Sequence, residues 1–273
     1  MAFTTRLATS DDYPIFARLF PELRVHDPMP DREHFAARML PRVLLLEGDD
    51  GGAIGYAYWQ RYDRTAHVVN VVVDPRVRGR GAGRALMDAL RAHVAAIGCT
   101  RWYLNVKTDN TPALRLYERC GLVPEHGIWV LRITWAQIDT LPGAASPSVV
   151  AFVTTPADDP ALGALYGYER DRLAQWRARP TTRLIALRDG GALAGFTAFD
   201  PTFPGAHPFR VAAPGLARPL LDGCRTAVPP GGYDYLHVTV EEHGALRDLF
   251  ERAGATLDFA LVQLGAALQA ARR

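Results

Sequence analysis

The sequence predicts an α/β protein built from two similar halves. Three observations support this fold class. A run of mostly β-branched residues, 67–73, leads into a glycine-rich turn and then into an amphipathic helix. Strand and helix patterns alternate around this segment, as they do in α/β domains. Several patterns of the first half then recur in the second half, which indicates an internal duplication.

The first elements precede the glycine-rich turn. The expected strands cover residues 3–7, 42–47, 53–62 and 67–73, and the expected helices cover 10–19 and 31–39. Ser10 is a suitable cap for the first of these helices. The strand over 67–73 suits a buried position because β-branched side chains pack well in a sheet, and Asp74-Pro75 stops it.

The turn consists of Arg78, Gly79, Arg80, Gly81, Ala82 and Gly83, and a helix is expected after it. Apolar side chains recur there at steps of three and four, which predicts a helix over about 83–97 with one apolar face. The residues of this face are Leu86, Leu90, Val94 and Ile97. Gly98 is a suitable end for the helix.

A glycine-rich turn between a strand and a helix binds phosphate, because its backbone N–H groups lie at the positive end of the helix. Arginines around the turn, Arg76, Arg78, Arg80 and Arg84, can add forked contacts to a pyrophosphate or a ribose phosphate. A dinucleotide fingerprint would need a third glycine where Arg84 stands, and the Gly-Lys-Ser/Thr ending of a nucleotide triphosphate loop is absent. The turn is therefore a phosphate site of another kind.

Two motifs resemble those of the GNAT superfamily of N-acetyltransferases. The pattern Arg/Gln-x-x-Gly-x-Gly/Ala is matched by Arg78, Gly81 and Gly83, and the pattern Asn-x-x-Ala-x-x-x-Tyr is matched, in the expected order, by Asn110, Ala113 and Tyr117. The resemblance covers roughly residues 3–133. It implies a mixed central sheet flanked by helices, acetyl-CoA as cosubstrate, and transfer of the acetyl group to a primary amine.

The resemblance also implies where acetyl-CoA binds. In such folds the sheet splays between the strand that ends at Val73 and the strand over 102–107, and the pantetheine arm pairs with backbone in that gap. The implied cosubstrate-binding residues are Val71, Val73, Arg78, Gly79, Arg80, Gly81, Ala82, Gly83, Arg84, Asn110, Ala113 and Tyr117. The Tyr117 hydroxyl is expected near the sulfur, as a general acid or as a hydrogen-bond donor.

The acceptor amine needs a base, because an amine with a reference pKa of about 10.4 arrives protonated. Many relatives supply a carboxylate from the strand before the turn, whereas this strand offers only His67 and Asn70. His67 could accept a proton near neutral pH, and Asn105 could hold a water or the amine. The other interpretation of His67 is a solvated residue at a strand end.

The second half is expected to be a GNAT-like domain without its chemistry. Residues 136–148 have linker composition, which predicts a catalytic domain over 1–135 and a second domain over 149–273. Residues 249–254 repeat 116–121 without a gap, but Phe250 stands where Tyr117 is expected to act. The arginines of the phosphate turn have no counterparts in this half. The second domain is expected to serve as an internal dimer partner that walls the acceptor cleft, or as a vestigial ligand-binding lobe.

Composition limits the other possibilities. The chain has 48% hydrophobic and 22% charged residues and a net charge of +2, which favours a globular cytoplasmic enzyme and gives little reason to expect a nucleic-acid partner. The sequence shows neither a long apolar stretch nor a secretory signal, so no membrane location is expected. Neither the cysteines nor the histidines have metal-ligand spacing, so no metal is expected.

These observations predict acetyl transfer from acetyl-CoA to a small-molecule or peptide amine within a ternary complex. The chain is expected to be a monomer with two pseudo-dimeric lobes, or a homodimer. An alternative from another class is a non-catalytic regulatory protein that binds acyl-CoA, because the carboxylate base is missing.

Overall fold

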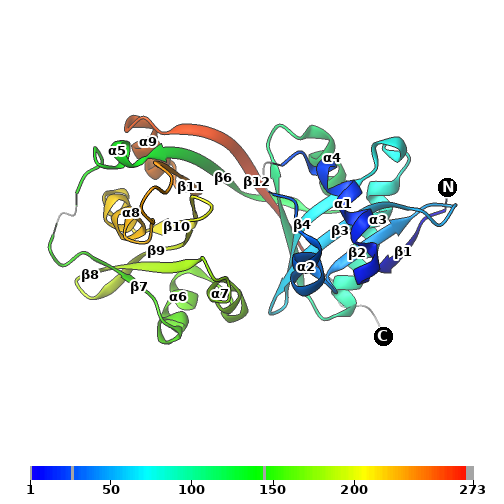
Figure 1. Cartoon of the computed structure of the whole chain (residues 1–273), viewed down its shortest axis with the longest axis horizontal. Coiled ribbons are helices and arrows are strands. Elements are labelled where there is room, and N and C mark those ends of the chain that lie inside the picture. The colour runs from blue at the N-terminus through cyan, green and yellow to red at the C-terminus, as the bar shows by residue number, and fades with distance from the viewer. Residues whose placement is uncertain (1, 26–27, 144–145, 269–273) are drawn as a thin grey trace. The chain divides into compact units, whose positions relative to one another are not determined.

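The computed structural model describes residues 2–25, 28–143 and 146–268 and divides the chain into two compact units (Figure 1). Unit 1 comprises Met1–Glu125 together with Gln263–Arg273, and unit 2 comprises His126–Val262. This division differs from the predicted one, which placed the boundary within residues 136–148. Of the predicted linker and second domain, residues 144–145 and 269–273 lie outside the described residues.

Unit 1 contains a mixed sheet with helices on both faces. Its strands are β1 (Thr4–Leu7), β2 (Val43–Glu47), β3 (Ala53–Tyr62), β4 (Thr65–Val73), β5 (Arg101–Lys107) and the end of β12 (Thr256–Ala267), in that order across the sheet. Its helices are η1 (Ser10–Asp12), α1 (Tyr13–Leu19), η2 (Phe20–Leu23), α2 (Arg32–His34), η3 (Phe35–Met39), η4 (Pro75–Val77), α3 (Ala82–Ala96) and α4 (Thr111–Arg119). Only β4 and β5 among β1–β5 run parallel, so the predicted mixed α/β fold is confirmed.

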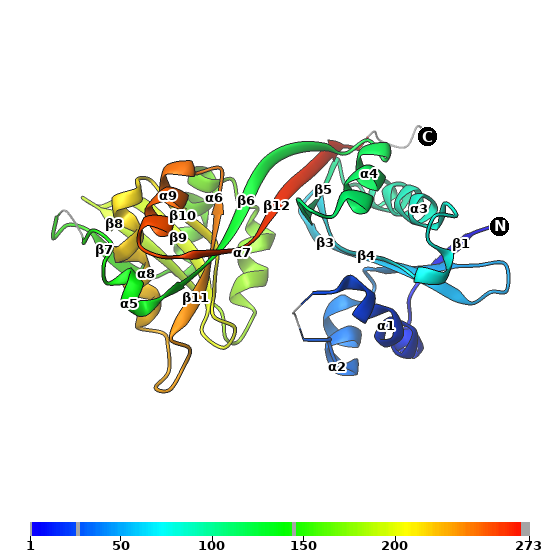
Figure 2. The ribbon, with the colours of Figure 1, turned by 90° about the horizontal axis from the view of Figure 1, so that it is seen from above.

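The two faces of this sheet have separate cores. Helices α1 and α2 cover one face, and α3 and α4 cover the other (Figure 2). On the α1 face the ring of Phe16 packs against Phe35 and Tyr56, with ring centroids 4.9 and 5.2 Å apart. On the other face α3 buries Leu86, Leu90 and Val94, as its apolar periodicity predicts. Ile97, expected on the same face, lies just past the end of α3 and is exposed. The sheet is therefore fixed from both sides, which positions the ends of β4 and β5.

Unit 2 has the same arrangement of elements. Its strands are β6 (Val123–Thr134), β11 (Tyr235–Glu241), β10 (Gly205–Val211), β9 (Ala192–Asp200), β8 (Arg183–Asp189) and β7 (Val150–Val153), in that order across the sheet. Its helices are α5 (Trp135–Ile138), η5 (Pro156–Asp158), α6 (Asp159–Tyr166), α7 (Arg170–Arg177), η6 (Pro214–Leu216), α8 (Ala217–Arg225) and α9 (Gly244–Arg252). One core contains Leu220 and Phe250, and the other contains Trp176 and Phe196.

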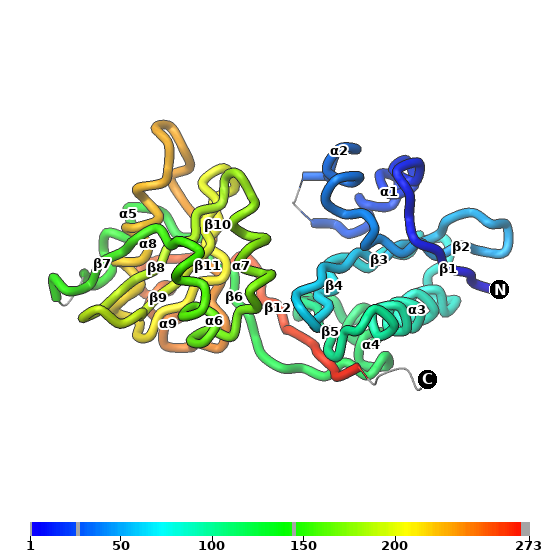
Figure 3. The backbone as a smooth tube through the Cα atoms, turned by 90° about the horizontal axis from the view of Figure 1, so that it is seen from below, coloured from blue at the N-terminus to red at the C-terminus, as the bar shows by residue number. Residues whose placement is uncertain are grey.

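Each unit completes its sheet with a strand from the other half of the sequence. Strand β6 follows α4 in the chain but pairs with β11 in unit 2, from Thr134 opposite Tyr235 to Ile128 opposite Glu241. The C-terminal end of β12 lies beside β5 in unit 1 (Figure 3), where the Leu268 N–H donates to the Thr100 carbonyl over 2.8 Å. Linker composition carries no information about strand partners, and this explains why the sequence placed β6 with the first half.

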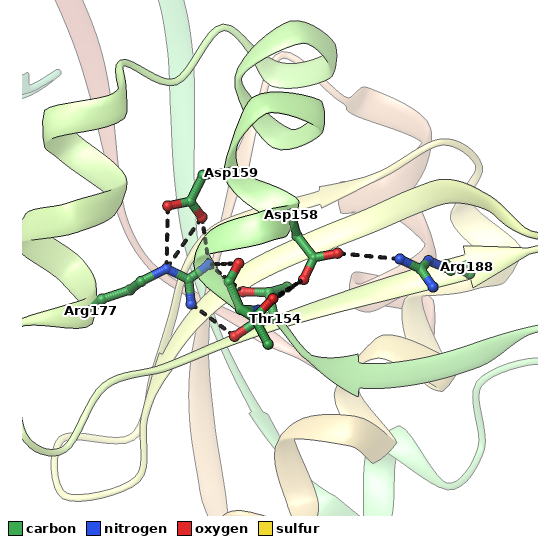
Figure 4. Close-up of polar contacts among 6 residues, drawn as sticks. Thr154, Asp158, Asp159, Arg177 and Arg188 are labelled. Carbon is green, nitrogen blue, oxygen red and sulfur yellow. Dashed lines mark hydrogen bonds and ion pairs between the residues drawn. The ribbon is translucent and has the colours of Figure 1, made fainter.

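The two units also begin their first helical segments in the same way. In unit 1 the Thr9 N–H and hydroxyl donate to the Asp12 carboxylate over 2.8 and 3.1 Å, and Thr155 and Asp158 repeat both distances in unit 2. Each is a capping box, which satisfies free N–H groups at a helix start. Asp158 also pairs with Arg188 on β8 (Figure 4). This repeated cap adds a sign of duplication to those seen in the sequence.

A separate ion pair holds the helices of unit 2 to its edge strand. The Arg177 guanidinium lies 2.5 Å from an Asp159 carboxylate oxygen and donates to the Thr154 carbonyl and hydroxyl (Figure 4). Arg177 ends α7, Asp159 begins α6, and Thr154 follows β7. The network is therefore structural. Within the part of the chain that the structure describes, no helix is both long and apolar enough to cross a bilayer.

Candidate active site

The sheet of unit 1 opens between β4 and β5. Their parallel pairing runs from Thr65 opposite Arg101 to Val68 opposite Leu104 and ends there. Strand β4 nevertheless continues on its other side along β3 as far as Val73 opposite Gly55. A bulge in the β3–β4 ladder falls at the same level, between the Trp59–Val68 and Tyr58–Asn70 pairs. Val71 and Val73 therefore lie on the part of β4 that has left β5, where the sequence places the pantetheine arm.

The predicted phosphate turn follows this opening directly. Gly79 and Gly81 have φ angles of 77° and 86°, which side chains with a Cβ rarely adopt, and α3 begins at Ala82. The first N–H groups of α3 have no partners within the helix and lie at its positive end. Gly83 has another role, because a Cβ there would lie 3.1 Å from the Leu116 Cδ2 atom. Its small size lets α4 approach the start of α3.

The four arginines around the turn have different environments. Arg80 is exposed and makes no hydrogen bond or ion pair with any of the described residues. Arg84 pairs with Asp88 over 2.7 Å and also donates to the Arg119 carbonyl at the end of α4. Arg78 donates from Nε to the Val73 carbonyl over 3.0 Å and pairs with Glu22 over 2.9 Å. Arg80 is therefore the arginine available for a phosphate without losing a protein contact.

Asp74 anchors the turn to α1, a role that the sequence analysis missed. Its side chain is 5% exposed and lies 2.6 Å from Arg76 and 2.9 Å from Arg18. Hydrogen bonds from Arg76 and Arg18 hold the pKa of the Asp74 carboxyl well below its usual range. Its backbone N–H donates to the Ile54 carbonyl over 2.8 Å. The sequence signal is an acid next to a proline at the end of a buried strand, a pattern that by itself predicts only the end of the strand.

The second motif lies on α4. Asn110 caps this helix, because its Oδ1 atom accepts from the Ala113 N–H over 3.3 Å. Two turns further on, Tyr117 is 9% exposed, and its hydroxyl has no hydrogen-bond partner among the described residues. Burial raises the pKa of the Tyr117 hydroxyl, so it stays protonated at neutral pH. The Asn110 cap thus fixes a helix that presents a protonated, unbonded hydroxyl.

His67 and Asn105 lie on one face of the opened sheet. The His67 ring stacks on Tyr103 with centroids 4.5 Å apart and planes at 3°, and Asn105 follows two positions later on β5, which places it on the same face as Tyr103. The Asn105 Oδ1 atom is buried without a partner among the described residues. Leaving a buried acceptor without a hydrogen bond costs free energy, so this atom is suited to accept one from a ligand N–H group or a water.

Unit 2 keeps the opening but not the turn. The parallel pairing of β10 with β11 ends at Ala206 opposite Val238. Beyond that point an ion pair between Arg210 on β10 and Glu241 on β11 joins the two strands. Residues 212–216 connect β10 to α8 with Gly215 as their sole glycine, whereas Gly79 and Gly81 lie among residues 74–81 of unit 1. The Phe250 ring is fully buried and packs edge-on to Phe209.

The residues that cap α4 and α9, the helices that carry Tyr117 and Phe250, also differ. His243 replaces Asn110, and its Nδ1 atom accepts from the Leu246 N–H over 3.3 Å. Unit 2 therefore keeps the helix cap with a different residue type. It has no counterparts of Gly79 and Gly81 and no hydroxyl at the position of Tyr117. The described residues of the whole chain include no group of three or more His, Cys, Asp or Glu side chains arranged to hold a metal.

Comparison with known proteins agrees with this geometry. Residues 11–122 match the acetyltransferase (GNAT) family model. The chain is 30% identical over 245 residues to a mycothiol acetyltransferase from Clavibacter michiganensis, covering 81% of this chain and 78% of that protein.

Solved structures share the fold over nearly the whole chain. A GCN5-related N-acetyltransferase from Sphaerobacter thermophilus is 24% identical with a TM-score of 0.67, covering 98% of this chain and 96% of that one. A tandem GNAT protein from the clavulanic acid biosynthesis pathway is 15% identical with a TM-score of 0.65, covering 99% and 100%. GNAT enzymes use acetyl-CoA as their cosubstrate. With both motifs in place on this fold, the chain belongs to the GNAT family and is an acetyltransferase.

Proposed function

We propose that this chain transfers the acetyl group of acetyl-CoA to a primary amine of a small molecule, by direct attack in a ternary complex within unit 1. The observation that supports this most strongly is the end of the β4–β5 pairing at Val68 and Leu104. The glycine turn and the start of α3 follow β4 directly, and α4 carries an unbonded tyrosine hydroxyl. An open strand edge can pair with the amides of a pantetheine arm, and a turn at a helix start can bind a diphosphate.

The cosubstrate would be held mainly by backbone. Amides of the pantetheine arm would pair with backbone groups near Val71 and Val73, as an added strand does. The diphosphate would accept hydrogen bonds from the N–H groups of residues 79–84, with Arg80 adding charge. A Cβ at Gly79 or Gly81 would meet no atom within 4 Å, so these glycines are needed for their backbone conformation. The residues present therefore fit the cosubstrate.

The acceptor amine must lose a proton before its nitrogen lone pair attacks the thioester carbonyl carbon. We assign the Asn105 Oδ1 atom to accept a hydrogen bond from this amine, because it is buried and otherwise unbonded. His67 lies on the same face and would take the proton through water. No carboxylate of β4 precedes the turn, so this role falls to a neutral side chain.

Breaking the carbon–sulfur bond leaves a thiolate, and Tyr117 would stabilise it. The raised pKa of Tyr117 makes full proton transfer to a thiolate, whose conjugate thiol has a reference pKa of about 8.5, unfavourable. The hydroxyl is therefore best suited to donate a hydrogen bond to the sulfur. The same fold in unit 2 has no such donor, because Phe250 occupies the position.

Thiol release from acetyl-CoA, measured over a panel of amines, tests the proposal. The relatives named mycothiol acetyltransferase give one acceptor to include, the amine form of mycothiol without its acetyl group. We expect amine-dependent thiol release and acetylated product with at least one small molecule. Tight acetyl-CoA binding with no turnover on any amine would instead support a regulatory protein that binds acyl-CoA.

A further inference from the structure

Glu22 places a carboxylate beside the phosphate turn. Its Oε2 atom lies 2.9 Å from an Arg78 terminal nitrogen, and the same guanidinium donates from Nε to the Val73 carbonyl. The side chains of Glu22 and Arg78 are 31% and 46% exposed, so both can be reached from solvent. Arg78 is the first residue of the phosphate-binding motif, and its guanidinium is paired with an acid in this structure.

The position of Glu22 is fixed by a second, more buried ion pair. Glu22 belongs to η2, which follows α1 directly, and Arg18 on α1 pairs with Asp74 at the start of the turn over 2.9 Å. Arg18 also donates to the Ala53 carbonyl over 2.6 Å. The segment that carries Glu22 is therefore attached to the segment that carries Arg78, and the two side chains stay within reach of one another.

We propose that Glu22 competes with the diphosphate of the cosubstrate for the Arg78 guanidinium and so limits the affinity for acetyl-CoA. A half-exposed ion pair is weak, whereas a diphosphate offers more charge and a forked contact to the same guanidinium. Binding then exchanges one partner of Arg78 for another, and the lost pair subtracts from the affinity. Glu22 is thus a positioning residue that acts through Arg78. The inference rests on the proposed cosubstrate site.

Calorimetric titration with coenzyme A tests the exchange. Glu22→Gln removes the competing charge with little change of shape, and we expect the Kd to fall two- to fivefold, which corresponds to about 0.4–1 kcal/mol. In an Arg78→Gln background the same substitution should give no gain, because the contested guanidinium is gone. A gain that persists without Arg78, or an unchanged or higher Kd in Glu22→Gln alone, would overturn the proposal.

A matched control separates this exchange from a simple loss of nearby negative charge. The charge of Asp50 acts on Arg76 at the turn, and its Oδ1 atom accepts from the Gly52 N–H, which an asparagine can also do. Asp50→Asn should change the Kd less than Glu22→Gln does, and an equal change would contradict the proposal.

The form of the carrier provides a second readout. With acetyl-pantetheine, which has no diphosphate, Glu22→Gln should leave KM and kcat unchanged, whereas with acetyl-CoA it should lower KM at constant kcat. An equal fall in KM with both carriers would overturn the exchange. If the unaltered chain binds no coenzyme A at all, the proposed function itself fails, a result distinct from any of these.

Discussion

The residues of the two GNAT motifs have different physical roles. Asn110 caps a helix, Gly83 lets two helices approach, and Tyr117 presents a hydroxyl. The sequence predicts all of them as site residues because the motif spacing is specific. The predicted phosphate contacts of Arg78 and Arg84 stay predictions, and in this structure both side chains also pair with protein carboxylates. Such partners come from segments distant in the chain, and spacing within a motif carries no information about them.

Tyr117→Phe tests the role of the hydroxyl. The variant keeps the ring, as Phe250 does in unit 2, so the fold should be unaffected. We expect kcat to fall by roughly tenfold or more, because the hydroxyl would stabilise the thiolate leaving group. The KM for acetyl-CoA should change little. Thiol release under saturating amine measures this. Wild-type turnover in the variant would remove Tyr117 from the chemistry.

Gly81→Ala tests the turn conformation. Its φ of 86° strains any residue with a Cβ, so we expect a loss of stability of about 1 kcal/mol together with weaker coenzyme A binding. Gly98→Ala is a matched control, since Gly98 has a φ of 90° and equally open surroundings at the far end of α3. Denaturant unfolding and calorimetry should show similar losses of stability but weaker binding only for Gly81→Ala. Equal affinities in the two variants would contradict the assignment.

At the scale of elements, the two units differ in what spans the opening between their parallel strands. Unit 1 leaves β4 and β5 apart beyond Val68, whereas in unit 2 the Arg210–Glu241 pair connects β10 to β11. Strand β10 is not among the expected strands, whereas β4 and the glycine turn follow from sequence patterns. The ion pair does not, because it joins residues whose proximity depends on the parallel pairing of β10 with β11.

The Glu241 carboxyl makes this ion pair testable through pH. Burial alone would raise its pKa, but His126 and the charge of Arg210 lower it to about 2 from an ordinary 4.5. A depressed pKa stabilises the folded state above about pH 4.5, and this contribution is lost as the pH falls toward 2. Glu241→Gln should therefore cost about 1–3 kcal/mol at pH 7 and progressively less below pH 4.5.

Denaturant unfolding at several pH values measures the effect of Glu241→Gln. Glu242→Gln is the control, because that neighbouring side chain is exposed and makes no ion pair with the described residues. A destabilisation by Glu241→Gln that does not change with pH, or an equal one in Glu242→Gln, would show that the pair contributes nothing specific.

At the scale of the whole molecule, the duplication could be predicted from sequence, but the exchange of strands could not. The repeated segments 116–121 and 249–254 contain the ends of the equivalent helices α4 and α9. Strand β6 joins β11, and the end of β12 joins β5, since sheet partners are set by long-range pairing rather than by local pattern. A truncation after residue 148 would therefore remove a strand from unit 1 and leave β6 without β11.

One titration tests whether unit 1 alone binds acetyl-CoA, as expected because unit 1 has the glycine turn and the open strand edge whereas unit 2 has neither the turn nor the tyrosine. Calorimetry of the full chain with acetyl-CoA should show one binding site per chain, with Gly81→Ala weakening that site. Two equivalent sites, or a single site unaffected by Gly81→Ala, would show that acetyl-CoA does not bind at the glycine turn of unit 1.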